Sequence, residues 1–288
     1  MNLLRESWKS FRLLMRNPVI YVPDLFMYVV TYILTVFLYK SSGLDFALQD
    51  FVMNGADKVA VFQNYLSTNW FQLLLSFLGF VFVTFFLGVG VESVKFRLIK
   101  DVIQRRETSL LRTVFTLNPY LFKLVVLKVY VYVITALIFL ISATMYLVYM
   151  QVDNTNVGIL IKVLVIAVAL PIVLFFRMGI YYRYAILFLD EYKHASRAFQ
   201  RSFNLLVDRP RSVIKVWVFS MVMGLLLWFL VSGVGFFARN FQDMVSNSTF
   251  IYIFSATVML LVYLFKLTYD IWENVLLFRT YPIIKKSS

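Results

Sequence analysis

The sequence contains no cysteine and a single histidine. Without cysteine, the chain has no disulfide, no thiolate nucleophile and no cysteine-ligated metal. The lone His194 cannot form the His-Glu-x-x-His pair of a metalloprotease, and neither Gly-x-Ser-x-Gly nor the P-loop pattern occurs. These absences remove the common hydrolytic sites. We therefore expect a non-enzymatic protein without a catalytic residue, a metal ion or a cofactor.

Charge is also scarce in this chain. Only 15% of its 288 residues are charged and 61% are hydrophobic, whereas soluble domains have roughly 25% charged and 45–50% apolar residues. A soluble domain is therefore excluded. Disorder is excluded too, because disordered chains contain too few apolar residues to collapse. The composition predicts an integral membrane protein.

Six long apolar runs interrupt the polar segments. Four contain no charged residue, and the first and fourth are interrupted only by Asp24 and Lys162 respectively. Each is close to the roughly 20 residues that a helix needs to cross the hydrocarbon core. We predict an all-α integral membrane protein with six transmembrane helices, and an external loop over residues 40–69. The six runs are residues 19–39, 70–91, 129–150, 157–176, 216–238 and 244–265.

The basic residues are unevenly distributed among the connections. Most of the 28 lysines and arginines precede the first span, lie in the second and fourth connections, or follow the sixth span. The positive-inside rule then predicts a multi-pass protein of the cell membrane with both termini cytoplasmic. The basic N-terminus argues against a cleaved signal peptide. Asn247 begins a glycosylation sequon on the predicted outer side.

The net charge of +13 has an explanation that needs no nucleic acid. Lysines and arginines beside a membrane gain about 1 kcal/mol each near an anionic leaflet. We expect anionic lipid headgroups as partners, with other membrane subunits or a soluble cytoplasmic protein as further possibilities. No nucleic-acid partner is expected.

Residues 10–18 and 202–210 share the pattern S-F-x-L-L-x-x-x-P, and residues 111–119 form a weaker middle copy. One pair of spans lies between successive prolines, so the copies have the same orientation in the membrane. We predict a single membrane domain, residues 1–288, built from three parallel hairpin repeats. The repeat units are roughly 1–100, 101–190 and 191–288.

The segment before each proline has helical periodicity. Apolar residues form one stripe in the first copy (Leu4, Trp8, Phe11, Met15) and another in the third (Tyr192, Ala195, Phe199, Phe203, Leu206). We predict that a cytoplasmic interfacial amphipathic helix precedes each hairpin, with its apolar stripe in the acyl boundary. The basic residues predicted to face headgroups or a partner are Arg5, Lys9, Arg12, Arg16, Arg197 and Arg201.

Tyr181-Tyr182-Arg183 through Asp190, followed by the pattern R-S-F-x-L-L at residues 201–206, resembles the repeat of a six-span membrane protein family. That family includes the membrane domain of some glycerophosphodiester phosphodiesterases and related uncharacterised bacterial and archaeal membrane proteins. The resemblance implies the six-span architecture and an accessory role in the membrane. It implies no active site, because phosphodiesterase members of the family carry their activity in a separate soluble domain.

Four charged residues inside or beside predicted spans form a candidate intramembrane polar cluster: Asp24, Lys123, Lys128 and Lys215. Charges in spans are functional candidates because they are costly to bury. One hypothesis is a site for an anionic headgroup, a substrate or an ion, in which Asp24 pairs with Lys123 or Lys128. The alternative is an ion pair that fixes packing, or lysines that extend to the nearby interface.

Two functions remain from the sequence. The first is a non-enzymatic scaffold or accessory subunit that organises lipids or protein partners. The second is a transporter or channel component for a small solute, ion or lipid. In the second function, transport would depend on Asp24, Lys123 and Lys128, and on a kink in the helix at Pro171.

Overall fold

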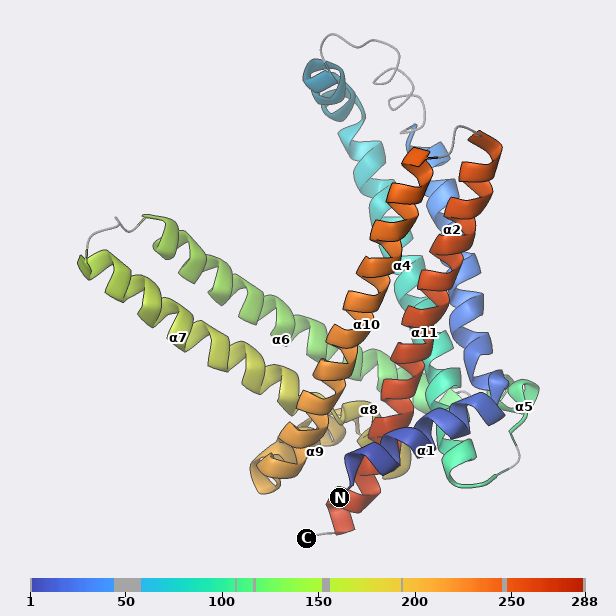
Figure 1. The fold of residues 1–288 in the computed structure, drawn as a ribbon. Coiled ribbons are helices and arrows are strands. Elements are labelled where there is room, and N and C mark those ends of the chain that lie inside the picture. Colours follow the sequence, from blue (N-terminus) through green and yellow to red (C-terminus); the bar gives the residue numbers. More distant parts are fainter. Residues whose placement is uncertain are drawn as a thin grey trace. The chain divides into compact units, whose positions relative to one another are not determined.

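The computed structural model describes residues 2–43, 58–106, 108–115, 118–151, 156–192, 194–244 and 248–286. Asn247 of the sequon lies outside these ranges. All regular structure within them is helical (Figure 1). The chain divides into two compact units. Unit 1 comprises Met1–Tyr21 and Phe96–Ser288, and unit 2 comprises Val22–Lys95. The division of the chain into three repeat units remains a prediction.

The described residues contain six helical stretches that are long and apolar enough to cross a membrane, as the sequence predicts. Only a small share of each stretch is buried by protein. Lipid is the solvent that suits such a surface, because exposed apolar area of this extent is unfavourable in water. The chain is a multi-pass membrane protein. The stretches are Pro18–Ser42, Ser67–Ile103, Tyr120–Leu147, Gly158–Leu189, Pro210–Ala238 and Ile253–Lys286.

The long helices extend beyond the apolar runs that predict them. They are α2 (Val22–Ser42), α4 (Lys58–Ile103), α6 (Asn118–Gln151), α7 (Asn156–Gly179), α10 (Pro210–Met244) and α11 (Ser248–Lys286). The external loop predicted at residues 40–69 is therefore too long, since α2 and α4 include both of its ends. Once a helix exists, each added residue gains a hydrogen bond, so polar flanks continue it.

Shorter helices lie between the long ones. They are α1 (Leu3–Arg16), the 3₁₀ helix η1 (Pro18–Tyr21), α5 (Leu110–Phe115), α8 (Arg183–Leu189) and α9 (Ala195–Asp208). Pro18 begins η1 and Pro210 begins α10, as expected for a residue that fits the first turn of a helix. The helix of the middle copy, α5, has only 6 residues, whereas α1 and α9 have 14 each.

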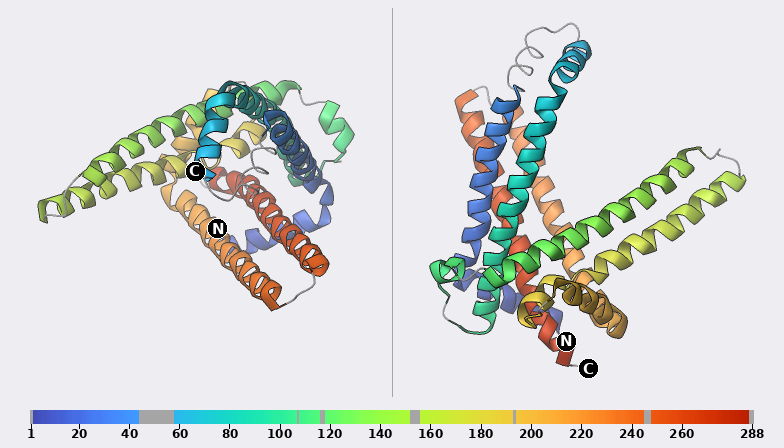
Figure 2. Two further views of the ribbon diagram at one scale, coloured as in Figure 1. Left: turned by 90° about the horizontal axis from the view of Figure 1, so that it is seen from above. Right: turned by 180° about the vertical axis from the view of Figure 1, so that it is seen from behind.

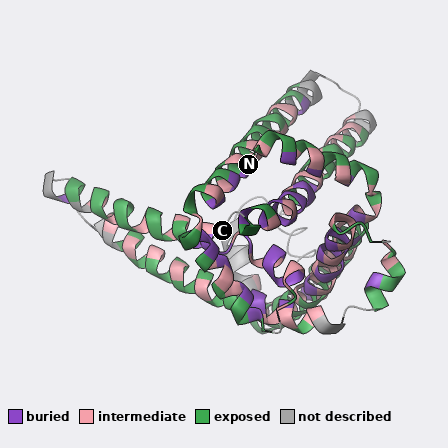
Figure 3. Ribbon diagram, turned by 90° about the horizontal axis from the view of Figure 1, so that it is seen from below, coloured by how far each residue is buried: buried purple, intermediate pink, exposed green. Residues whose placement is uncertain are grey.

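In unit 1, α6 and α7 form one antiparallel hairpin, and α10 and α11 form another (Figures 1 and 2). Helix α9 contacts α6, α7, α8 and α10, so it connects the two hairpins. Buried residues gather around α8 and the C-terminal half of α11 (Figure 3). There the rings of Phe96, Phe188 and Phe278 pack with centroids 5.6–6.4 Å apart. An aromatic cluster thus forms part of the core of unit 1.

A glycine permits close packing at the end of α7. A Cβ on Gly179 would lie 2.3 Å from Cε1 of Phe203 in α9. Phe203 packs in turn against a cluster of buried apolar residues that includes Phe176 and Ile180. Only a residue without a side chain fits between this backbone and the ring.

Unit 2 consists of α2 and the part of α4 up to Lys95. Gln72 Nε2 donates to the carbonyl of Ser41 at 2.7 Å, near the end of α2. At the other end of α2, Lys95 Nζ donates to Asp24 Oδ1 at 2.9 Å. Polar contacts therefore join the two helices near both ends of the apolar stretch.

Candidate functional site

Helix α1 lies across the C-terminal half of α11 (Figure 1). One carboxylate holds it there. Glu6 Oε2 accepts a hydrogen bond from Arg279 Nη2 at 2.9 Å, and Oε1 accepts one from Lys9 Nζ at 2.8 Å. Trp272 Nε1 also donates to the carbonyl of Ser7 at 3.3 Å. Helix α1 therefore contacts α11 through polar groups of Glu6 and Ser7.

The charge of Glu6 is stabilised in place. Burial alone would raise the pKa of this carboxyl, but hydrogen bonds and charge from Lys9 and Arg279 outweigh burial and lower the pKa below its ordinary 4.5. Glu6 is therefore ionised wherever the protein is neutral to mildly acidic.

The opposite side of α1 is apolar and uncovered. Leu4, Trp8 and Met15 are 73%, 58% and 62% exposed. Arg5, Arg12 and Arg16 are exposed beside them, and the Arg12 guanidinium lies 5.9 Å from the centre of the Trp8 indole ring. An exposed apolar stripe thus runs next to an exposed basic one.

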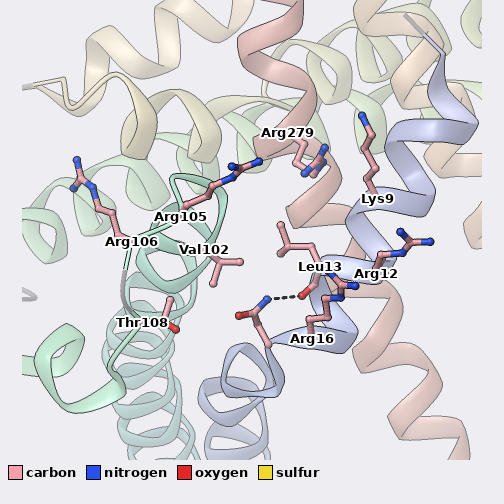
Figure 4. A pocket seen from close by; sticks show the side chains of 10 residues that line it. Lys9, Arg12, Leu13, Arg16, Val102, Arg105, Arg106, Thr108 and Arg279 are labelled. Carbon is pink, nitrogen blue, oxygen red and sulfur yellow. Dashed lines mark hydrogen bonds between the residues drawn. The ribbon is translucent and has the colours of Figure 1, made fainter.

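A basic cleft of about 400 Å³ lies beside α1 (Figure 4). Helices α1 and α11 and the segment after α4 line this cleft, and no described acidic residue does so. Asn17 Nδ2 donates to the carbonyl of Leu13 at 2.8 Å and fixes one wall. The basic residues of the cleft are Lys9, Arg12, Arg16, Arg105, Arg106 and Arg279, and the others are Leu13, Asn17, Val102 and Thr108.

The backbone after α4 turns sharply at the cleft. Arg105 has φ 56°, in the left-handed region. The Arg106 N–H bonds the carbonyl of Asp101 at 2.9 Å and the Arg105 N–H that of Val102 at 3.2 Å, which is the Schellman arrangement usually built on glycine. An arginine here accepts a conformational cost that glycine would avoid.

An apolar groove of about 540 Å³ adjoins the other side of α1. Leu4, Trp8 and Phe11 of the exposed stripe form one wall, and mostly apolar residues of α10 and α11 form the others. The same helix thus borders a basic cleft and an apolar groove.

A third cavity, of about 410 Å³, is polar and lies among α7, α8, α10 and α11. Its walls include Arg177, Arg183 and Glu273. The Tyr181 hydroxyl donates to Glu273 Oε1 at 2.9 Å. A carboxylate and two guanidinium groups therefore share this polar cavity.

The candidate intramembrane cluster divides between the two units. Asp24 belongs to unit 2, where it pairs with Lys95. The predicted pairing of Asp24 with Lys123 or Lys128 stays a prediction. Lys95 is one of the basic residues of the second connection, so the sequence marks it only as part of the charge bias that sets topology. Both partners are largely buried, with side chains 15% and 10% exposed.

The three predicted lysines lie in unit 1 and differ in their surroundings. Lys128 is buried, and Lys123 Nζ lies 5.6 Å from the ring centre of Tyr120. Lys215 is exposed. A cluster that unites these lysines with Asp24 remains a prediction.

Helix α9 differs from α1 in what covers its apolar stripe. Ala195 and Leu206 are buried, and Phe199 and Phe203 are half-buried against the cluster around Phe176. Protein, not the acyl boundary predicted from the sequence, covers this stripe, because α9 connects four other helices. On its outer side Arg197 is exposed, and Arg201 Nη1 lies 3.6 Å from Asp208 Oδ2.

Ion pairs that the sequence analysis did not identify join the ends of the helices in unit 1. Lys100 Nζ, buried, binds Glu191 Oε1. The hydrogen bond and charge of Lys100 lower the pKa of the Glu191 carboxyl. Asp190 accepts a hydrogen bond from Lys285 Nζ at 2.8 Å and another from the Tyr281 hydroxyl. These pairs connect residues about 90 positions apart, so no local pattern indicates them.

The segment that carries the family resemblance is mainly structural. The fully buried Tyr182 shares a hydrogen bond of 2.9 Å with Thr280 Oγ1. Ser202, Leu205 and Leu206 are also buried. In this chain the pattern therefore marks side chains that hold α8 and α9 in the core.

No protein-family model, curated protein or solved structure matches the chain. Within the described ranges, no group of three or more His, Asp or Glu residues could hold a metal ion.

Proposed function

We propose that this protein is a non-enzymatic scaffold or accessory subunit of the cell membrane, which organises anionic lipids or protein partners at the cytoplasmic face. In this proposal both termini are cytoplasmic, and the six spans form three parallel hairpins. Helix α1 lies in the interface between headgroups and acyl chains.

The arrangement of α1 is the observation that supports this proposal. A peripheral helix with a polar anchor to the protein at Glu6 leaves Leu4, Trp8 and Met15 exposed. Because those side chains gain about 25 cal/mol per Å² on leaving water, the acyl boundary is a favourable environment for them. Arg5, Arg12 and Arg16 then lie at headgroup level, where anionic lipids attract them.

The natural absence of cysteine makes the interfacial position of α1 testable. Phe11→Cys and Met15→Cys, each labelled with an environment-sensitive fluorophore, should give blue-shifted emission in vesicles. The matched control Arg5→Cys should give emission typical of water. Equal emission from all three labels would contradict an interfacial α1.

The accessory role has its own test. Native mass spectrometry of the protein, gently extracted from its own membrane, should show stoichiometric subunits or retained anionic lipid. A protein that carries neither would count against the scaffold proposal.

A transporter or channel component is the second candidate, and the polar cavity at Glu273 is the observation that favours it. Charged and hydrogen-bonding side chains in a cavity beside spans mark transport pathways. For a transporter, Asp24→Asn and Glu273→Gln should abolish ion flux in proteoliposomes loaded with a pH- or potassium-sensitive dye. If wild-type flux equals that of empty vesicles, transport of those ions is excluded. Normal flux in Asp24→Asn would remove Asp24 from the pathway.

A further inference from the structure

We propose that the basic cleft binds a phosphate group that carries two negative charges, as in a phosphomonoester lipid headgroup or a free phosphate anion. The lipid form of this inference rests on the proposed function, and the free anion form does not. The cleft includes Arg105, Arg106 and Arg279, which the sequence analysis did not assign to any ligand.

The positive charge of the cleft is only partly balanced by the described acidic residues. Six cationic side chains line about 400 Å³, and Glu6 already accepts hydrogen bonds from two of them, Lys9 and Arg279. Arg12, Arg16 and Arg105 have no ion pair with any described acidic residue. Like charges gathered in one cavity repel one another, so an anion that enters the cleft relieves repulsion as well as gaining attraction.

The hydrogen-bonding groups are also suited to phosphate. Five of the six cations are arginines, whose planar forks match phosphate oxygens in pairs. The Nε of Arg279 is buried and has no hydrogen-bond partner in the described part of the chain. In Figure 4 the side chain of Arg105 extends from the segment after α4 toward Arg279 of α11. An oxyanion between them could bond to both.

The backbone conformation at Arg105 is one that favours glycine, yet the residue there is a cation. Glycine would adopt φ 56° without strain, whereas arginine does so at a cost. The arginine at this turn extends the positive surface of the cleft between α1 and α11.

Charge density should distinguish ligands. A phosphomonoester carries about −1.5 to −2 at neutral pH and has three terminal acceptor oxygens. A phosphodiester has a single charge and two such oxygens. We therefore expect the cleft to prefer phosphatidate over phosphatidylglycerol.

The test uses the full chain in an uncharged detergent, with binding measured by native mass spectrometry and calorimetry. The probes are short-chain phosphatidate, short-chain phosphatidylglycerol and pyrophosphate. Arg12→Gln combined with Arg105→Gln removes two cations from the cleft. Arg211→Gln combined with Lys286→Gln removes two exposed cations outside it and is the matched control. Near-UV circular dichroism shows whether each variant keeps the native fold.

We expect the cleft variant to bind phosphatidate at least about tenfold more weakly, because it loses two charged hydrogen-bond donors to the phosphate oxygens. The control should bind within about twofold of wild type. If phosphatidate binds much more tightly than pyrophosphate, the ligand is a lipid. If the two bind alike, and both depend on the cleft, the ligand is a free phosphate anion.

Three results would overturn the inference. They are equal weakening in the cleft variant and the control, equal affinity for phosphatidate and phosphatidylglycerol, and no binding of phosphatidate or pyrophosphate by wild type. Equal weakening would leave the proposed function intact, because anionic lipid would still bind through diffuse charge. If wild type retains no anionic lipid at all, the lipid part of the proposed function fails too.

Discussion

Arg279, in the last part of α11, donates a hydrogen bond from Nη2 to Oε2 of Glu6 in α1 at 2.9 Å. The two residues are 273 positions apart, so the bond joins two segments that are distant in the sequence. Glu6 is the acidic residue of a helix that otherwise carries only basic charges. This carboxylate therefore provides the ion pair between α1 and α11.

Glu6→Gln should destabilise the protein by about 2 kcal/mol, since it replaces a buried charge-assisted pair by a neutral amide and leaves Arg279 without its counter-ion. Thermal unfolding in detergent, followed by tryptophan fluorescence, measures the change. Asp208→Asn is the control. Its partner Arg201 is 3.6 Å away and both side chains are more than a third exposed, so the loss should be below about 1 kcal/mol. Equal losses of stability in the two variants would show that the Glu6–Arg279 pair contributes no more than an exposed ion pair.

Gly179→Ala should destabilise unit 1 by about 1–3 kcal/mol, because its Cβ would overlap the ring of Phe203. Gly233→Ala in α10 is the matched control, because nothing lies within 4 Å of the position of its Cβ. Alanine there should be neutral or stabilise the helix by up to about 1 kcal/mol. The same unfolding assay tests both. A neutral Gly179→Ala would mean that Phe203 can move at little cost.

Asp24 and Lys95 should show energetic coupling in unit 2. Asp24→Asn and Lys95→Gln each leave a buried charge with one partner fewer, whereas the double variant removes both charges. We expect a coupling energy of about 1–3 kcal/mol in a double-mutant cycle of unfolding free energies. Strictly additive effects would contradict a direct interaction.

Stability should fall with acid in a defined range. The pKa values of Glu6 and Glu191 are lowered in the folded state. Their contribution to stability is therefore complete above the unfolded value of 4.5, and is lost as the pH falls through the folded values. We expect a nearly constant unfolding temperature from pH 7 to about pH 5, and a decrease below about pH 4.5. Glu6→Gln combined with Glu191→Gln should flatten this decrease. An unchanged acid slope would contradict the assignment.

The number and positions of the spans could be predicted because each depends on local composition. A run such as residues 216–238 is apolar over the length that a helix needs to cross a bilayer, whatever it packs against. The prolines at 18 and 210 similarly mark helix starts through local chemistry alone.

The contacts of the candidate site could not be predicted in the same way. Lys95 and Lys100 are indistinguishable in sequence from surface lysines, yet both are buried beside carboxylates. The apolar stripes of α1 and α9 are alike in sequence, but one is exposed and the other covered by protein. Arg105 has no sequence signal for its left-handed backbone. These differences arise from which segments meet in the folded chain.

The bond between Glu6 and Arg279 also orders events during synthesis. Ribosomes add about 5–20 residues per second, so α1 is made tens of seconds before its partners on α11. In that interval its carboxylate has neither Arg279 nor the indole of Trp272 beside Ser7. Helix α1 can therefore form this bond only after α11 has been made. A chain that stops before residue 279 lacks Arg279. Its helix α1 therefore cannot form this ion pair, and Glu6 keeps only Lys9 as a partner.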